Sequence, residues 1–408
     1  MRDAPRFSDR RADGSSREIR ATRDILQKTD DPMTDSFSRA IRCLILGVLV
    51  LAARTASSQA TVSLGREIWV SSHEFGAISS VRELADGRLL VADRTDNRLV
   101  LLSTSGEFVR DIAREGQGPG EYTAVGWVHP LGADSTLFVD SFSSRWSLFF
   151  RDRFVTSFAE TRLLNRSLDA ELAGVDAEGR VVGFGGIRGS PSRPVLRAEA
   201  DSLNVIRATL DGTQSDSLLR VKGRASRMTM LPPSNGRPAT ILMGTPFDTE
   251  DRIALGRDGS MAIVYTSPYR VDWLRRDGSR IRGAVIESAP ARLNREQACA
   301  ITKTRFNGSS CEAVLGNATS QTLPAFLPTI RHFPEPVVAI EPSGRLLVRR
   351  VSADGQSQQY DIIDGRGLRV GRLTLRGDEA VVGFGKDAIY VVRSTEDGIR
   401  ELRRHLWN

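Results

Sequence analysis

Apolar residues along this chain come in short runs, and the clearest runs each follow a tight polar turn. Runs of three to five apolar residues bounded by turn residues predict buried β-strands, and helical periodicity is nearly absent. The pattern therefore predicts an all-β protein. The clearest runs are residues 89–91, 261–264 and 346–348, which follow Asp86-Gly87, Asp258-Gly259 and Ser343-Gly344.

The turn and the apolar run recur six times in all. Weaker copies place runs 137–139, 181–182 and 389–392 after Asp134-Ser135, Glu178-Gly179 and Lys386-Asp387. Successive turns are 48, 44, 80, 85 and 43 residues apart. Four short antiparallel strands need roughly 40 to 50 residues, the size of one propeller blade. The spacing predicts a six-bladed β-propeller of four-stranded antiparallel blades, with insertions near residues 186–250 and 289–328.

The first blade is the clearest, and the last is one strand short. The strands expected in the first blade are Ile78–Glu83, Arg88–Ala92, Arg98–Leu102 and Glu107–Ile112. After the run that ends at Val392, only Ile399–Leu406 is strand-like. An unpaired sheet edge is an aggregation hazard. We therefore expect the strand-like segment Val62–Val70 to join the last blade and close the ring.

Residues 86–122 resemble one NHL-type repeat, and in particular the exported bacterial six-bladed propellers grouped as TolB-like. The likeness rests on the sequence from Asp86-Gly87 through Asn97-Arg98 to the Gly116–Tyr122 phrase, and later copies lack the last two features. The resemblance implies a propeller fold over residues 61–408. It implies function only loosely, because propellers host lyases, lactonases, ligand binders and scaffolds.

The N-terminal region predicts export to the periplasm or the extracellular space. Arg39 and Arg42 precede the apolar stretch 43–53, and Ser58-Gln59-Ala60 offers small residues to a signal peptidase. The stretch is shorter than the roughly 20 residues that a membrane-spanning helix needs, so no transmembrane segment is expected after signal removal. We predict a signal peptide at 33–60. Residues 1–32 are either a disordered extension or the product of a mis-called start, with Met33 instead of Met1 as the first residue.

Cysteine usage agrees with export. Cys43 would leave with the signal peptide, and Cys299 and Cys311 remain as an even pair around a short polar segment. In an oxidising compartment such a pair predicts a disulfide that pins a surface loop. A zinc site or a redox pair is the weaker alternative, since no His lies nearby and redox cysteines are usually closer in sequence.

The formal charge of +7 invites a nucleic-acid interpretation, which the distribution of charge argues against. The chain has 57 Lys and Arg residues, of which only four are Lys, and no run of five like charges interrupts the predicted propeller. Nucleic-acid binding proteins cluster their basic residues on one face or strand. We expect no nucleic-acid partner.

Two motifs look like sites and are better explained as structure. Asp93 with Asn97-Arg98 is expected to tie a turn by bonding nearby backbone amides, although Arg94 or Arg98 could also contact a ligand. The Gly116–Gly120 segment resembles a phosphate loop, but it lacks the Lys-Ser/Thr that follows such loops and a helix after it. We expect it to be a crossover between blades.

No catalytic residue can be assigned. His73, His129, His332 and His405 are isolated in sequence, although His129 and His332 could reach the channel, the latter near Glu335. Gly-x-Ser-x-Gly is absent. A central cation such as calcium would need inward carboxylates from several blades. Candidates beside first strands are Glu83, Asp176 and Glu341.

The sequence therefore favours a binding module for an unknown protein or small-molecule ligand, monomeric and without a cofactor. The alternative is a metal-dependent enzyme, lactonase-like or lyase-like, with a cation such as calcium in the central channel.

Overall fold

Within the computed structural model, the described part of the chain runs from residue 60 to residue 407 with several gaps. The gaps are residues 141, 144, 160–170, 186–201, 224–225, 235–236, 245–248, 289–290, 300–310, 312–319, 324–337 and 351–356. The predicted signal peptide and the segment before it lie outside the described residues, apart from Ala60. What is described belongs to one unit, Gln59–Asn408. No helix in this part of the chain is long and apolar enough to cross a membrane.

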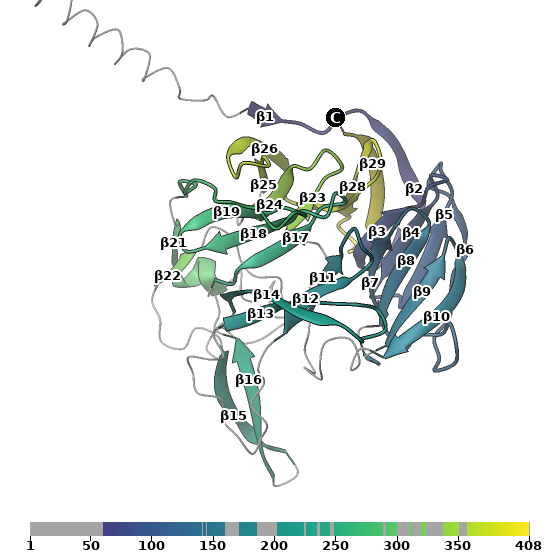
Figure 1. Ribbon diagram of the computed structural model, residues 1–408, viewed down its shortest axis with the longest axis horizontal. Coiled ribbons are helices and arrows are strands. Elements are labelled where there is room, and N and C mark those ends of the chain that lie inside the picture. The colour runs from purple at the N-terminus through teal and green to yellow at the C-terminus, as the bar shows by residue number, and fades with distance from the viewer. Residues whose placement is uncertain are drawn as a thin grey trace, which may run out of the picture. The chain divides into compact units, whose positions relative to one another are not determined.

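Six antiparallel sheets of four strands form the predicted blades (Figure 1). Blade 1 contains β3 (Ile78–Glu83), β4 (Leu89–Asp93), β5 (Arg98–Leu102) and β6 (Phe108–Asp111). Blade 2 contains β7 (Val125–Leu131), β8 (Ser135–Asp140), β9 (Arg145–Phe150) and β10 (Arg153–Ala159). Blade 3 contains β11 (Glu171–Val175), β12 (Val181–Gly185), β13 (Ser202–Ala208) and β14 (Ser215–Lys222).

The remaining blades follow the same order along the chain. Blade 4 contains β17 (Arg252–Leu255), β18 (Met261–Thr266), β19 (Tyr269–Leu274) and β20 (Arg280–Ile281). Blade 5 contains β23 (Val338–Ile340), β24 (Leu346–Arg350), β25 (Ser357–Ile363) and β26 (Arg369–Arg376). Blade 6 contains β27 (Glu379–Phe384), β28 (Ala388–Ser394), β29 (Arg400–Leu406) and, from the start of the propeller, β2 (Glu67–Phe75).

The recurring turn leads into the second strand of every blade, as the sequence predicts. Four of its glycines have φ between +78° and +89°, a left-handed conformation that is costly for residues with a Cβ. They are Gly87, Gly179, Gly259 and Gly344. The turn glycines therefore allow the tight reversal, and the apolar run that follows enters the core.

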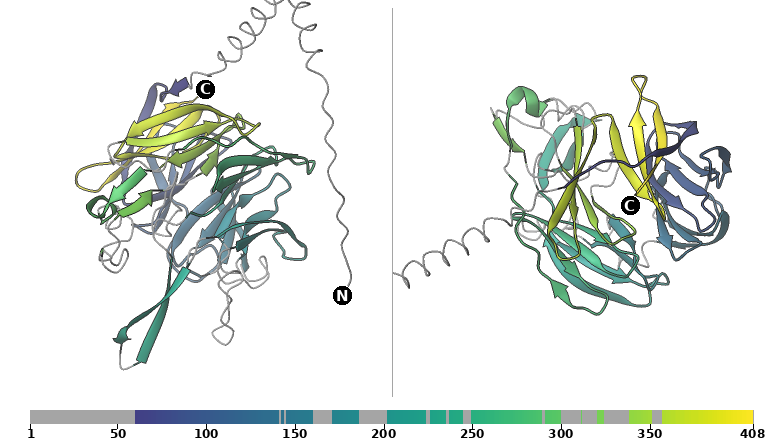
Figure 2. Two further views of the ribbon diagram at one scale, coloured as in Figure 1. Left: turned by 90° about the vertical axis from the view of Figure 1, so that its left-hand side faces the viewer. Right: turned by 90° about the horizontal axis from the view of Figure 1, so that it is seen from above.

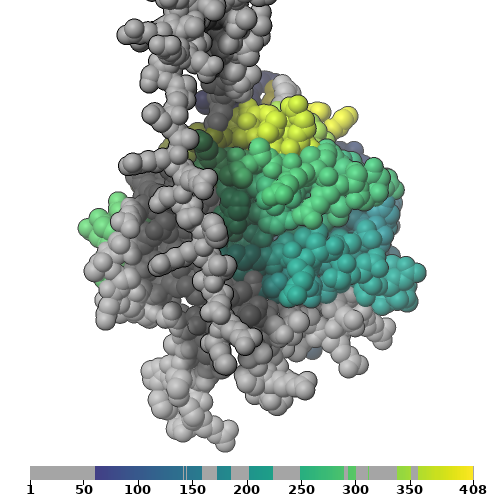
Figure 3. Space-filling model, turned by 60° about the vertical axis from the view of Figure 1, so that its left-hand side comes forward, coloured from purple at the N-terminus to yellow at the C-terminus, as the bar shows by residue number. Residues whose placement is uncertain are grey.

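Hydrophobic clusters lie between neighbouring blades, one for each of the six junctions. Successive side chains of a strand point to opposite faces, so each blade contributes to the cluster on either side. In β24, for example, Leu346 packs toward blade 4 and Leu347 toward blade 6. Figure 3 shows residues of blade 4, in green, between those of blade 3, in teal, and the yellow C-terminal blades. The hydrophobic core is thus divided among the six interfaces between neighbouring blades.

One charged group is buried in the interface between blades 4 and 5. Asp361 of β25 has no exposed surface and accepts hydrogen bonds from Nε and Nη2 of Arg372 at 3.0 and 2.9 Å. The hydroxyl of Tyr269 donates to it at 3.2 Å from blade 4. Arg350 and Arg369 lie 3.4 and 3.7 Å from its carboxylate. These contacts link the two blades through charge as well as apolar packing.

The ring closes through the N-terminal segment, with one correction to the predicted strand. β2 pairs with β29 as the outer strand of blade 6, and it spans Glu67–Phe75 instead of Val62–Val70. The polar residues after Val70 hide the rest of the strand in the sequence, because outer strands alternate between exposed and partly buried positions. Upstream, β1 (Ala60–Val62) adds a fifth, parallel strand to blade 5 along β26 (Figure 2).

Two additional hairpins occupy connections between blades. β15 (Ser226–Ser234) and β16 (Arg237–Gly244) pair between blades 3 and 4, and Figure 1 shows them extending away from the ring. β21 (Ala291–Asn294) and β22 (Ser320–Leu323) pair between blades 4 and 5. Both hairpins fall within the ranges where the sequence predicts insertions. β13 and β14, which also fall in the first range, belong to blade 3.

Candidate functional site

The topology gives the ring two different faces. The turn face carries the connections between the first and second and between the third and fourth strands of each blade. The loop face carries the connections between the second and third strands and the crossovers between blades. The ring centre is the region enclosed by the first strands β3, β7, β11, β17, β23 and β27. Both additional hairpins belong to crossovers and so to the loop face. A site in such a fold is expected at the ring centre or on the loop face.

The structure places Glu83 in a bridge between blades 1 and 6. Its carboxylate accepts hydrogen bonds from the hydroxyl of Tyr390 and, at 3.2 Å, from the backbone N–H of Lys386. Arg404 of β29 lies 3.6 Å away. Burial, together with the Glu83 carboxylate, raises the pKa of Tyr390, so the hydroxyl stays a donor. This carboxylate is engaged by blade 6.

Asp176 and Glu341 are both engaged in their own turns. Arg180 donates from Nε to Asp176 at 2.8 Å, and Arg345 donates from Nη2 to Glu341 at 3.1 Å. Burial acts to raise the pKa of Glu341, but hydrogen bonds from Arg345, Ser343 and Trp407 outweigh it and hold the pKa below its usual range. Each acid lies four residues before its arginine, so the sequence does contain a signal for this role.

On the loop face, Asp93 closes the end of blade 1, as the sequence predicts. Its carboxylate accepts hydrogen bonds from the amides of Gly76 and Ala77 at 2.8 and 2.9 Å. A third comes from the amide of Thr95 at 3.1 Å. Because these donors belong to the crossover into the blade and to the next turn, one side chain ties two connections together. Asp93 is therefore a turn residue.

Asp140 repeats this arrangement in blade 2. It accepts from the amides of Thr123 at 2.7 Å and Phe142 at 3.0 Å. The hydroxyl of Ser143 donates to it at 2.6 Å. Burial acts to raise the pKa of Asp140, but these hydrogen bonds outweigh it and lower the pKa. In blades 1 and 2, therefore, the carboxylate at the end of the second strand has the same structural role.

Asn97 and Arg98 are also structural. Asn97 has φ of +54° and accepts the amide of Val125 at 2.8 Å. Arg98 donates to both oxygens of Asp111 at 3.0 and 2.9 Å, and its guanidinium lies 5.4 Å from the ring centre of Phe108. Arg94 lies over the ring of Trp127 at 5.0 Å. The motif fixes blade 1 against the crossover that follows it.

The Gly116–Gly120 segment forms the crossover from blade 1 to blade 2, as predicted. The amide of Gly118 donates to the Glu121 carboxylate at 2.8 Å, and the amide of Gly116 donates to the Tyr122 carbonyl at 2.8 Å. Arg145 of blade 2 donates to the Gln117 carbonyl at 2.9 Å. A phosphate-binding loop needs free amides. Here the protein itself occupies two of them.

The three histidines that the structure describes lie apart from one another. His73 stacks on Phe108 in the outer part of the ring with 5.1 Å between ring centroids, and His405 lies there too, with Nδ1 3.2 Å from the Gly65 carbonyl. His332 and Glu335 lie outside the described residues. In the described part of the chain, no group of three or more His, Cys, Asp or Glu side chains is arranged to hold a metal ion.

His129 lies on β7, one of the first strands that enclose the ring centre. A Cβ on Gly174 of blade 3 would lie 3.9 Å from its Nδ1 and 3.2 Å from Leu255 of blade 4. Burial lowers the pKa of His129 to about 4, so its imidazole is neutral at pH 7.

Two arginines near the turn face were missed by the sequence analysis. Arg82 of β3 is 5% exposed and donates from Nη2 to the carbonyls of Gly132 and Ala133 at 3.1 and 3.0 Å. Its Nε is buried without a hydrogen-bond partner. Arg257, in the first turn of blade 4, is exposed and makes no ion pair with any described residue. The sequence does contain a signal for Arg82, because it is a charged residue within a strand that is expected to be buried.

Cys299 and Cys311 are joined in a disulfide, with their Cα atoms 5.2 Å apart. The bridge links the short helical turn that follows β21 to the residues before β22. It closes a loop of the insertion between blades 4 and 5, on the loop face. The described residues place no catalytic group beside it.

Comparison with known proteins supports the fold. A family model described as 6-bladed beta-propeller matches residues 70–126, which run from β2 through blade 1 to the start of β7. The sequence has no match among curated proteins.

Similar solved structures share little sequence with the chain. A protein of Bacteroides fragilis predicted to be exported is 10% identical with a TM-score of 0.45, over 86% of this chain and 100% of that one. A Bacteroides thetaiotaomicron protein of unknown function is 9% identical with a TM-score of 0.41, over 86% and 75%. Virginiamycin B lyase from Staphylococcus aureus is 8% identical with a TM-score of 0.34, over 84% and 87%. We base no functional argument on these similarities.

Proposed function

We propose that this six-bladed β-propeller is an exported, monomeric binding module of the NHL/TolB-like kind, which holds its ligand at the ring centre and does not transform it. Export is supported by the signal-like segment before Ala60 and by the disulfide between Cys299 and Cys311. Both features are typical of proteins in an oxidising compartment.

The proposal rests on a contrast between carboxylates that already accept hydrogen bonds within the protein and arginine donors that have no partner in the described part of it. Glu83, Asp176 and Glu341, the candidate ligands of a central cation, are each held by an arginine, a tyrosine or a turn. Nε of Arg82 has no hydrogen-bond partner among the described residues, and Arg257 is exposed and forms no ion pair with a described residue. N–H donors without a partner can bind a polar ligand. A catalytic metal would instead need free carboxylates, and these three are already engaged.

The proposal is tested by thermal melting of the purified protein against a panel of sugars, peptides, nucleotides and organic acids. A ligand at one hundred times its Kd stabilises the folded state by about 2.7 kcal/mol, which is a readily measured rise in Tm. We expect at least one class to raise the Tm, with no change in the presence of a chelator and no ligand turnover by mass spectrometry.

The competing interpretation is a metal-dependent, lactonase-like or lyase-like enzyme. Metal analysis of the same preparation separates the two. A stoichiometric cation, together with a fall in Tm on chelation, would overturn the proposal in favour of the enzyme. A discrete protein partner on crosslinking, with no small-molecule response, would instead show that the bound ligand is a protein.

A further inference from the structure

The closing strand β2 contains a bulge next to blade 1. Where β29 has one residue, Leu402, β2 has the segment from Ser71 to His73. The hydroxyl of Ser71 accepts the backbone N–H of His73 at 3.0 Å, which fixes the bulge locally. Extra residues in a strand re-aim their side chains, and bulges are often kept for that purpose. Since Leu402 is apolar, β29 places no charge opposite the bulge.

The imidazole of His73 packs between two phenylalanines. Phe75, also on β2, meets its ring edge-on with 4.8 Å between centroids, and Phe108 of β6 stacks on it at 5.1 Å. Aromatic pairs at such distances attract one another. Phe108 is 43% exposed, so the contact lies near solvent. His73 thus links the outer strand of blade 6 to the outer strand of blade 1.

A fixed positive charge lies beside this histidine. Nη1 of Arg98 is 3.5 Å from Nε2 of His73, while Nε and Nη2 of Arg98 donate to the two oxygens of Asp111 at 3.0 and 2.9 Å. A guanidinium has only donors, so Nε2 is the acceptor here and the imidazole is neutral. A protonated imidazole would direct a second N–H at the guanidinium. The contact therefore favours the neutral form of His73.

Three carboxylates near His73 oppose this preference without overcoming it. Burial and the charge of Arg98 lower the pKa of His73, whereas the charges of Asp93, Asp111 and Asp96 act to raise it. The docked imidazole therefore stays neutral to a lower pH than one on a detached strand, whose pKa would be the ordinary 6.5.

We propose that His73 makes the contact between β2 and blade 1 sensitive to acid, with protonation releasing the bulged part of β2 from β6. Well above pH 6.5 the contact is complete. As the pH falls below 6.5, the detached strand takes up a proton that the docked strand does not, so detachment becomes easier. The inference concerns the closure of the ring and does not depend on which ligand the propeller binds.

Hydrogen exchange at pH 7.5 and at pH 5.5, followed by mass spectrometry and corrected for the intrinsic pH dependence of exchange, tests the inference. We expect the protection of β2 to fall about two- to tenfold between the two values, tenfold being the limit for a group of pKa 6.5 in the detached strand. β18 of blade 4 is the internal reference, and its protection should change less. No fall in β2 beyond that of β18 would overturn the inference.

His73→Gln keeps a polar side chain that does not titrate, so the fall in the protection of β2 should disappear. His405→Gln is the matched control, because it removes the histidine of the neighbouring strand β29 and leaves the contact with Phe108 and Arg98 in place. The control should keep the fall. An equal fall in both variants would show that His73 is not the responsible group.

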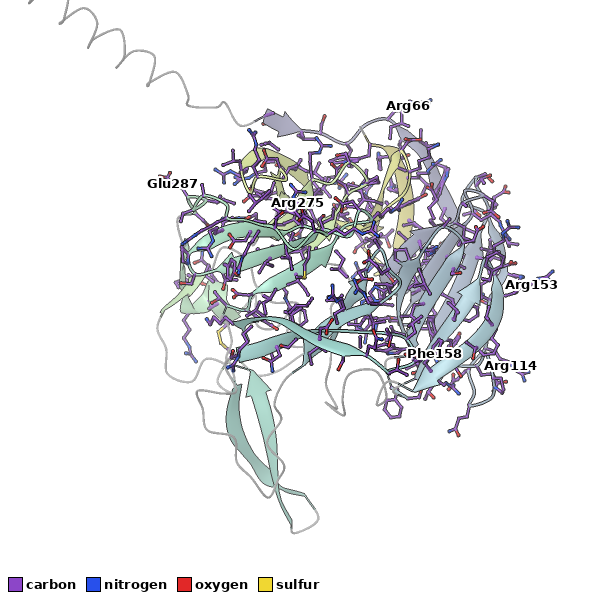
Figure 4. All side chains as sticks on the ribbon, viewed as in Figure 1. Arg66, Arg114, Arg153, Phe158, Arg275 and Glu287 are labelled. Atoms are coloured by element: carbon purple, nitrogen blue, oxygen red, sulfur yellow. A yellow bond between two sulfur atoms is a disulfide. The ribbon has the colours of Figure 1, made fainter. Side chains whose placement is uncertain are left out.

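Arg98→Gln tests the charge beside the imidazole. It removes the cation that disfavours protonation, so the fall should shrink although His73 is still present. Arg114→Gln removes the same charge from the crossover after β6, where the side chain is exposed and lies at the outer edge of the ring in Figure 4. This control should respond like the unaltered protein. A fall that Arg98→Gln leaves unchanged would contradict the proposed role of the contact.

Discussion

Two buried charges in this propeller differ in how the protein surrounds them. Asp361, between blades 4 and 5, has three arginines and a tyrosine around it, whereas Arg82, on a first strand of the ring, donates to two backbone carbonyls. The first charge is matched by fixed partners of opposite sign. The second is not. A buried charge with matched partners contributes to the packing of the blades, whereas one without a carboxylate partner costs more to bury.

The largest effect is expected from Asp361→Asn. The substitution keeps the shape of the side chain but leaves Arg350, Arg369 and Arg372 without their carboxylate, and removing one member of a buried ion pair typically costs about 3–5 kcal/mol. Urea denaturation measures the loss. Asp216→Asn, on an outer strand and 64% exposed, breaks an ion pair with Arg207 and should cost under about 1 kcal/mol. Equal losses in the two variants would show that Asp361 does not hold the blades together.

A second effect concerns His129, a partly buried group on a first strand whose pKa is lowered by desolvation. Well above pH 6.5 the imidazole is neutral in both folded and unfolded chains. Between pH 6.5 and about 4 the unfolded chain takes up a proton that the folded chain does not, so stability falls as the pH falls. The shift is worth about 3 kcal/mol at most, at 1.36 kcal/mol for each pH unit.

Urea denaturation at pH 7.5 and at pH 4.5 checks this expectation by comparing the protein with His129→Gln. The substituted protein should lose less stability between the two values. An unchanged loss would mean that His129 reaches solvent freely in the folded state, and the contrast between the ring centre and the blade interfaces would weaken.

Arg82→Met sharpens the comparison with Asp361 most directly. It removes two hydrogen bonds but also removes a buried charge that Arg257 repels, and the two effects should offset to within about 1 kcal/mol. Urea denaturation is the measurement. A loss as large as that expected for Asp361→Asn would show that Arg82 is a structural link between blades 1 and 2.

The smallest effect is expected from Arg257→Gln. Because the change relieves repulsion on Arg82 and disrupts no described ion pair, stability should stay the same or rise by up to about 0.5 kcal/mol. A clear loss in the same denaturation assay would reveal a structural role for Arg257.

Blade 1 shows how far sequence reasoning reaches. Its four strands are predicted within a residue or two, because turn residues such as Gly87 and Gly106 mark the boundaries and apolar runs mark the core. Outer strands are harder to predict, since one side faces solvent. The polar residues from Ser71 to Glu74 concealed half of β2 for that reason.

The candidate site was less predictable than the fold. Sequence position placed Glu83, Asp176 and Glu341 beside first strands, but it did not show which neighbour would engage each carboxylate. Arg82 contacts the turn of blade 2 about 50 residues further along the chain, which the closing of neighbouring blades brings together. Such proximity depends on tertiary structure, and no local pattern encodes it.

The N-terminal segment that pairs with two blades has a mechanical consequence. β1 runs parallel to β26 and β2 runs antiparallel to β29, so residues 60–75 hold the edges of blades 5 and 6 together. Tension applied upstream of Ala60 would load β1 first and β2 next. The ring would then open within blade 6, between β2 and β29, because every junction between neighbouring blades is spanned by continuous chain. Under force applied through its N-terminus, the propeller would thus lose the pairing of β1 first and that of β2 second.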